Sequence, residues 1–349
     1  MSEKVLLKGN DAIAEAAIRA GCGAYYGYPI TPQNELIAYM AREMLKRGRI
    51  FIQAESEVAA INMVYGASSA GLRAMTSSSS PGISLKQEGL SYAAGADIPL
   101  VIVNVVRGGP GLGSIAPAQS DYFQSTRGGG HGDYRCLVFA PKSVQECADL
   151  TYQAFDCADQ YRIPVLILAD GMIGQMMEGV VLPPEKTALP PRTWIVGNMA
   201  GREPRHITSI NLVPEALEAQ TRARFERYEA LKAQEVRYEY TGDADPELTI
   251  VAYGTCARVA LGAIKYAQKQ GRRLGLLRPI TLWPFPAKPL ADLAQNGRPL
   301  LTVEMSMGQL VEDVRLAVLG KAPVHLLSHC GGVIPTEEEV FAQALQIIG

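Results

Sequence analysis

The first half of the chain alternates short apolar runs with helical patterns, and no other feature of the sequence constrains the fold as strongly. Helical patterns occupy 10–21, 33–47, 55–70 and 85–96. Strand-like runs occupy 23–27, 50–53, 74–76, 99–106 and 163–169. Parallel strands need a crossover connection, usually a helix, so repeated strand–helix units predict a doubly wound parallel sheet of the α/β class.

After residue 185 the composition changes. The segment LPPEKTALPPRTW is proline-rich and predicts an extended connector, which leads into a charged helix at 214–235. A second alternation of strand and helix signals follows from residue 248. We therefore predict a sheet domain at 1–185, a connector with a charged helix at 186–245 and a smaller α/β domain at 246–349.

Net charge and the lengths of the apolar segments bear on whether the protein binds nucleic acid or a membrane. The formal net charge is -2, so no long-range field favours nucleic acid or an anionic membrane. Charged residues near the N-terminus leave no apolar signal segment, and runs such as 99–106 are far shorter than the roughly 20 residues of a membrane helix. We expect a cytoplasmic protein with no nucleic-acid partner and no membrane partner.

Cysteine spacing bears on redox and metal chemistry. The six cysteines stand at 22, 136, 147, 157, 256 and 330, and none forms a CxxC pair. Iron–sulfur and zinc sites usually contain closely spaced cysteines. We therefore expect buried thiols, no metal site and no redox centre on this chain.

A glycine-rich segment at 107–135 directly follows the apolar run 99–106. Its eight glycines allow the backbone to come close to a ligand or another chain. Ligands in open α/β sheets bind beyond the carboxyl ends of the strands, so this segment is a candidate ligand loop, with a flexible surface loop as the alternative. His131, beside Asp133, could transfer protons or be an exposed loop residue, and both interpretations stay open.

Two acids, Glu55 and Glu57, lie at the start of the helix expected at 55–70. The helix dipole alone favours glutamate in a first turn. The helix is otherwise rich in Ala, Ser and Gly, so it can pack closely, and a carboxylate at its start would be partly buried and would need a partner. A cofactor nitrogen could be that partner.

Several long motifs resemble one family. They are GYPITPQNEL (27–36), QAESEVAAINMVYGASSAG (53–71), TSSSSPGISLKQEGLSYAAGADIPLVIVNVVRGGPG (76–111), LADGMIG (168–174), GTCARVALGAI (254–264) and LRPITLWPFP (277–286). With them the chain resembles, nearly end to end, the alpha subunit of 2-oxoacid:ferredoxin oxidoreductases. The resemblance implies a thiamine-diphosphate-binding domain of the pyrimidine type, followed by a transketolase-C-terminal-like α/β domain.

The resemblance also implies roles in cofactor binding. Glu57 stands nine residues before Gly66 and matches the family's pyrimidine glutamate, whereas Glu55 is the weaker match. Such a glutamate hydrogen-bonds ring nitrogen N1′ and favours the imino tautomer, which removes the thiazolium C2 proton. The pyrimidine pocket would be lined by Tyr28, Pro29 and Ile30.

Two further residues match family positions that contact the substrate. Arg107 matches the arginine that holds the 2-oxoacid carboxylate, and its fork of donors suits a carboxylate. Thr31 matches the threonine that offers a hydroxyl to the same group. The implied reaction is oxidative decarboxylation with coenzyme A as co-substrate and ferredoxin as electron acceptor.

The family's other parts are expected on partner chains. The family's diphosphate-binding domain carries a GDG motif, and no GDG occurs here. The resemblance therefore implies a beta subunit that holds the diphosphate through Mg²⁺. It further implies gamma and ferredoxin-like delta subunits, with [4Fe-4S] clusters on partners.

The substrate and the class of protein leave alternatives open. The segment GGGHGDYR (128–135) looks more like the branched-chain, 3-methyl-2-oxobutanoate type, with 2-oxoglutarate or pyruvate as alternatives. A 2-oxoglutarate enzyme would need another cation, for which Arg127 and His131 are candidates. A complete homodimeric thiamine enzyme conflicts with the missing GDG motif. A non-catalytic assembly subunit conflicts with the joint presence of Glu57, Thr31 and Arg107.

Overall fold

The computed structural model describes residues 4–197 and 200–349, and its larger sheet has seven strands. In spatial order these are β12 (Thr281–Trp283), β6 (Leu137–Phe139), β7 (Pro164–Asp170), β5 (Leu100–Val106), β4 (Ala74–Ser78), β2 (Ala24–Gly27) and β3 (Ile50–Gln53). Neighbours are parallel except for β12, which runs antiparallel to β6. The predicted parallel sheet is therefore present.

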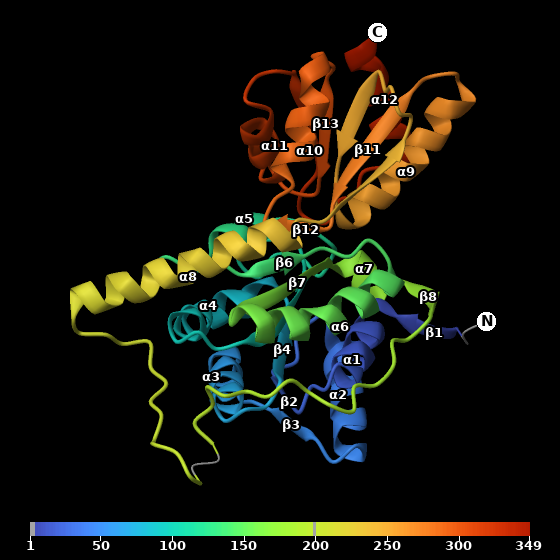
Figure 1. Ribbon diagram of the computed structural model, residues 1–349. Helices are drawn as coiled ribbons and strands as arrows, with labels where there is room; N and C mark the ends of the chain where they lie inside the picture. The colour runs from blue at the N-terminus through green and yellow to red at the C-terminus, as the bar shows by residue number, and fades with distance from the viewer. Residues whose placement is uncertain (1–3, 198–199) are drawn as a thin grey trace.

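Helices cover both faces of this sheet. One face carries α1 (Gly9–Arg19), α2 (Asn34–Lys46) and α6 (Val144–Tyr161), and the other carries α3 (Glu57–Ser69) and α4 (Ser80–Gly95). Two short helices, α5 (Tyr122–Arg127) and α7 (Gly171–Gln175), lie near the junction with the second domain (Figure 1). In β5, Val101 and Val103 pack in one apolar core and Leu100 and Ile102 in the other, as strand alternation requires.

The second sheet has five strands. Their order is β14 (Val324–Ser328), β13 (Leu300–Glu304), β10 (Leu248–Val251), β11 (Leu274–Pro279) and β9 (Tyr238–Gly242), with β9 antiparallel to β11. Its helices are α9 (Gly254–Lys269), α10 (Ala287–Leu293), α11 (Leu310–Val318) and α12 (Glu337–Ile348), with a 3₁₀ turn at Ala294–Asn296. This domain stacks on the larger one (Figure 1), and β12 crosses back to extend the larger sheet.

The charged helix α8 (Pro214–Glu235) lies along the larger domain, near the junction (Figure 1). Although most of its surface is exposed, Tyr228 and Leu231 are buried, and Arg224 pairs with Asp97 at 3.1 Å. The connector before α8 runs past the helices of the larger domain, and a small ribbon of β1 (Val5–Lys8) and β8 (Met177–Val180) lies beside α1.

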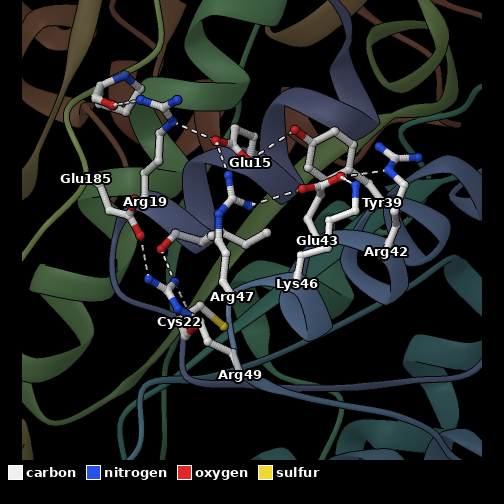
Figure 2. Close-up of polar contacts among 12 residues, drawn as sticks. Glu15, Arg19, Cys22, Tyr39, Arg42, Glu43, Lys46, Arg47, Arg49 and Glu185 are labelled. Atoms are coloured by element: carbon white, nitrogen blue, oxygen red, sulfur yellow. Dashed lines mark hydrogen bonds and ion pairs between the residues drawn. The ribbon is translucent and has the colours of Figure 1, made fainter.

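A polar cluster ties α1 to α2 at the amino end of β3 (Figure 2). The buried Glu15 carboxylate accepts hydrogen bonds from Arg19 at 2.7 Å, Arg47 at 3.1 Å and the Tyr39 hydroxyl at 3.1 Å. Arg49, directly before β3, pairs with Glu185 at 2.6 Å and so anchors the start of the connector. Burial and the Glu15 charge raise the pKa of Tyr39. These contacts lie opposite the carboxyl edge of the sheet and stabilise the scaffold.

Across the described residues, no helix is both long and apolar enough to cross a membrane.

Candidate active site at the carboxyl edge of the larger sheet

Three segments that leave parallel strands meet at one edge of the larger sheet. They are the turn at 28–33 after β2, the start of α4 after β4, and the loop at 107–117 after β5. Carboxyl ends of parallel strands share an edge, so side chains from distant parts of the sequence come together here.

Arg107 is held at the centre of this edge. Its side chain is largely buried, with the residue 8% exposed. The guanidinium donates to the Thr31 carbonyl at 2.9 Å through Nη1 and to the Leu112 carbonyl at 2.9 Å through Nη2, while Nε is buried without a partner. The structure therefore brings Arg107 and Thr31 together and leaves part of the guanidinium fork free.

The turn after β2 supplies the remaining residues matched to the pocket. Thr31 is half-buried, and its hydroxyl accepts a hydrogen bond from the Asn34 amide at 3.0 Å. Tyr28 is 37% exposed, Pro29 is exposed and Ile30 is half-buried. In the chain alone these side chains lie at the surface and are available to a ligand or another chain.

The structure separates the two acids of α3. The helix begins at Glu57, two residues later than the pattern predicted, because the Ser56 hydroxyl caps it by accepting from the Ala59 N–H at 3.1 Å. Glu55 therefore lies outside the helix and is exposed, whereas Glu57 is only 6% exposed. No hydrogen bond or ion pair involves the Glu57 carboxylate within the described parts of the chain.

Gly82 makes room for the Glu57 carboxylate. A Cβ at this position of α4 would lie 2.5 Å from Glu57 Oε1 and would also collide with the Ser78 hydroxyl. The helix containing Gly82 starts at Ser80, five residues before the predicted start at residue 85. Pro81 in the first turn, which favours a helix start, was a usable signal for the true boundary.

The start of α4 is tied to β5 by a buried polar chain. Asn104 accepts from the Ser80 N–H at 3.1 Å and donates to Asp121 at 2.8 Å. Burial raises the pKa of the Asp121 carboxyl, and the hydrogen bonds from Asn104 and Ser80 oppose this shift. The Ser80 hydroxyl also bonds the Arg107 N–H at 3.1 Å, so the position of α4 and that of Arg107 are linked.

Lys86 is a buried residue of this region that the sequence patterns did not single out. It is completely buried, and its ammonium donates to the Thr76 hydroxyl at 2.6 Å and the Ser77 carbonyl at 3.0 Å. Burial lowers the pKa of Lys86 to about 7, and the nearby Glu57 charge opposes this shift. Its spacing of four residues from Gly82, one helical turn, was the signal available in the sequence.

The glycine-rich segment divides into two parts. The first part, 108–117, follows Arg107 and contacts its side chain through the Leu112 carbonyl. In the second part, Gly129 and Gly130 pack on the flank of α4 at Gln87. His131 is exposed, and only its carbonyl is bonded, by Ser91 at 2.7 Å. The Arg127 side chain forms an ion pair with Asp313 of α11 at 2.7 Å.

A cavity of about 510 Å³ lies between the two domains, and Ser80, whose hydroxyl accepts from the Arg107 N–H, is one of its lining residues. The larger domain contributes Ser80, Gly109 and Asp121, and the smaller contributes Met305, Met307 and Cys330, among others. Its lining residues include no Lys, Arg or His. In the described part of the chain, no group of three or more His, Cys, Asp or Glu residues is arranged to hold a metal ion.

The predicted burial of the cysteines holds for five of the six. Burial raises the pKa of Cys22 and Cys136 to about 12 and that of Cys147, Cys157 and Cys256 as well. The sixth, Cys330, is exposed, because it lies in the loop after β14 that borders the interdomain cavity.

Comparisons with known proteins agree with this arrangement. A family model described as pyruvate flavodoxin/ferredoxin oxidoreductase, thiamine diP-binding, matches residues 15–234, and the pyruvate:ferredoxin oxidoreductase core domain II matches residues 246–340. These matches confirm the predicted fold class.

Individual relatives extend the match over the whole chain. The ketoisovalerate oxidoreductase subunit VorB of Methanothermobacter marburgensis is 48% identical over 99% of this chain and 98% of its own. The 2-oxoglutarate synthase subunit KorA of Methanothermobacter thermautotrophicus is 36% identical over 99% of this chain and 100% of its own.

A solved structure shows the same architecture. It is the 2-oxoglutarate:ferredoxin oxidoreductase of Magnetococcus marinus, with 2-oxoglutarate, coenzyme A and succinyl-CoA bound, and it superposes with a TM-score of 0.89 at 27% identity. The match covers all of this chain and 66% of that one. The chain therefore belongs to the pyruvate flavodoxin/ferredoxin oxidoreductase family, as a thiamine-diphosphate-binding subunit of a multi-subunit 2-oxoacid oxidoreductase.

Proposed function

We propose that the complex containing this chain oxidatively decarboxylates 3-methyl-2-oxobutanoate, with coenzyme A as acyl acceptor and ferredoxin as electron acceptor. The observation that carries the proposal is a pair of groups at one sheet edge with no hydrogen-bond partner among the described residues: the carboxylate of the largely buried Glu57 and the buried Arg107 Nε–H. Buried polar groups are normally hydrogen-bonded, so both positions suit a polar ligand.

The Glu57 surroundings fit the pyrimidine ring of thiamine diphosphate. Glu57 is largely buried, its carboxylate has no hydrogen-bond donor among the residues that the structure describes, and it lies against a residue without a side chain, Gly82. When bound, thiamine diphosphate supplies the carbon nucleophile that attacks the keto carbon. Glu57 would accept a hydrogen bond from ring nitrogen N1′ and hold the proton there, while Tyr28, Pro29 and Ile30 would contact the ring.

Arg107 would hold the substrate carboxylate. Two of its five N–H groups are bonded to carbonyls, which orients the guanidinium, and Nε together with the second N–H of a terminal nitrogen remains for a two-pronged contact. Thr31, whose carbonyl touches the same guanidinium, would offer its hydroxyl to the carboxylate or the keto oxygen. Together they would orient the 2-oxoacid toward Glu57 and the cofactor.

The lining of the interdomain cavity favours a branched-chain acid over 2-oxoglutarate. A second carboxylate would need a cation, yet the lining contains methionines and the acidic Asp121, and Arg127 is already paired with Asp313. The relative with 48% identity is named for ketoisovalerate, which is 3-methyl-2-oxobutanoate, whereas the 2-oxoglutarate synthase relative is 36% identical.

We place the remaining cofactors on partner subunits. The sequence has no GDG motif, so a beta subunit would hold the diphosphate through Mg²⁺. Gamma and delta subunits would complete the complex, and [4Fe-4S] clusters on partners would pass electrons to ferredoxin. The exposed Tyr28 and Pro29 would then lie at the contact with the beta subunit.

The test compares Glu57→Gln with the matched control Glu55→Gln in the reconstituted complex. The amide at position 57 cannot stabilise a protonated N1′, so turnover and exchange of the cofactor's C2 proton should both fall roughly 10²–10⁴-fold. The exposed Glu55 should tolerate the same change with little loss. Equal losses in the two variants would show that the cofactor carboxylate has been assigned to the wrong residue.

A further inference from the structure

Lys86 is a buried cation that the proposed reaction does not use. It is on α4, completely buried, and donates to the Thr76 hydroxyl and the Ser77 carbonyl of β4. Both acceptors are neutral, so hydrogen bonds alone do not balance its charge. Moving an ammonium ion out of water is unfavourable unless an opposite charge lies nearby.

The structure provides that charge on the facing helix. Gly82 and Lys86 are four residues apart, so they lie on the same face of α4, and Gly82 abuts the Glu57 carboxylate of α3. Within the described parts of the chain the Glu57 carboxylate makes no hydrogen bond or ion pair, and it acts electrostatically on Lys86. The Lys86 ammonium and the Glu57 carboxylate therefore each supply the opposite charge that the other group needs.

The other elements around Lys86 offer no competing charge. Strands β4 and β5 contain no titratable residue. On α3, Tyr65 has a pKa raised by burial, and on β2, Tyr25 has a pKa raised by burial while its hydroxyl lies 2.6 Å from Ser77 Oγ, so both phenols are neutral. On β7, Asp170 is taken up by four hydrogen bonds from α7 and Thr255.

We propose that Lys86 is a positioning residue for Glu57. The Lys86 ammonium and the Glu57 carboxylate form a coupled buried charge pair. This inference rests on the proposed role of Glu57 toward the cofactor. The ammonium holds its proton because the carboxylate is charged, and it keeps the carboxylate directed along the α3–α4 contact. A ligand that takes up the Glu57 charge would weaken the hold of Lys86 on its proton.

The coupling can be measured without cofactor. The full-length chain is labelled at lysine Cε with ¹³C, the Lys86 signal is assigned by its loss in Lys86→Met, and its titration is followed in wild type, Glu57→Gln and Glu55→Gln. Removing the Glu57 charge should lower the pKa of Lys86 by roughly one unit. The Glu55 control should titrate like wild type. Identical Lys86 titrations in all three proteins would overturn the charge pair.

A second measurement tests the positioning role in the reconstituted complex. Lys86→Met should lower kcat and C2-proton exchange about tenfold, while KM for the 2-oxoacid stays within about twofold. A tenfold fall in rate corresponds to about 1.4 kcal/mol. Lys86→Arg, which keeps the charge, should recover part of the loss. Unchanged exchange in Lys86→Met would refute the positioning role. If the titrations show coupling but Glu57→Gln keeps full activity, the charge pair stands and the proposed function fails.

Discussion

Replacing Arg107 should separate substrate binding from cofactor activation. Its guanidinium is oriented by the Thr31 and Leu112 carbonyls, and its buried Nε–H has no partner among residues 4–197 and 200–349. A hydrogen bond between charged groups contributes about 1.5–3 kcal/mol, which corresponds to roughly 10- to 150-fold in affinity. Arg107→Ala should therefore raise KM for the 2-oxoacid by roughly that factor. Arg107→Lys should recover only part of it, because a point charge cannot make the two-pronged contact.

The assay pairs steady-state kinetics with C2-proton exchange in the reconstituted complex. Under the proposed function exchange would depend on Glu57 and the cofactor, so it should stay near the wild-type rate in both Arg107 variants. Because Arg107 also holds the loop at Leu112, Gly113→Ala serves as a control for loop disturbance. Gly113 has a φ of +57°, and a Cβ there would collide with the Gly108 carbonyl. Gly113→Ala should raise KM less than Arg107→Ala, because it disturbs the loop but keeps the guanidinium. The carboxylate role is refuted if exchange collapses in Arg107→Ala while KM stays normal.

Three other predictions follow from the same region. The purified chain should bind thiamine diphosphate only weakly by titration calorimetry, because the diphosphate half of the site is expected on a partner, and micromolar binding that depends on Mg²⁺ would contradict the split site. Gly82→Ala should slow C2-proton exchange although alanine favours helices by about 1 kcal/mol over glycine, because the new methyl group displaces the Glu57 carboxylate; exchange at the wild-type rate would show that this close contact has no role. Burial lowers the pKa of Lys86 to about 7, so the unfolded chain binds more protons between pH 7 and the ordinary lysine pKa, and folding stability rises with pH in that window. Scanning calorimetry should accordingly find that the unfolding free energy of Lys86→Met, compared with wild type, is on the order of 5 kcal/mol higher below pH 7 than at pH 10.5. A difference between the two proteins that does not change with pH would contradict this.

Five strands of the larger sheet, β2, β3, β4, β5 and β7, were predicted because their signals are local, whereas β6, β12 and the helix α6 were not. The run at 99–106 has apolar residues on both faces, as a central parallel strand needs, and the structure has β5 at Leu100–Val106. The charged helix was predicted at 214–235 with the bounds that the structure shows. Boundaries set by a side-chain contact were less accurate: α3 begins two residues after its predicted start because Ser56 caps it, and α4 begins at Ser80, five residues before its predicted start.

The strands that the patterns missed depend on distant partners. Strand β12 has only three residues and exists because β6 lies beside it, across more than a hundred residues of sequence. The residue type of Lys86 favoured an exposed position, since charged residues on helices are normally solvated, and only its spacing from Gly82 pointed inward. Its burial follows from the packing of α4 against β4, which supplies the Thr76 hydroxyl, and against α3, which carries Glu57.

The glycine-rich loop shows why the site needs both domains of the chain. Gly108 bonds the Ala116 carbonyl at 2.9 Å and lies so close to Gly331 that a Cβ would be 3.0 Å from that residue's carbonyl carbon. Gly332 of the smaller domain lies closer still to the loop, since a Cβ there would be 2.4 Å from the Ala116 Cβ. Side chains at these positions would push the two backbones apart, and the loop that carries the Leu112 carbonyl would move away from Arg107. The smaller domain thus supports the loop that orients Arg107, and under the proposed role of Arg107 it would affect substrate binding although none of the residues matched to the reaction lies within it.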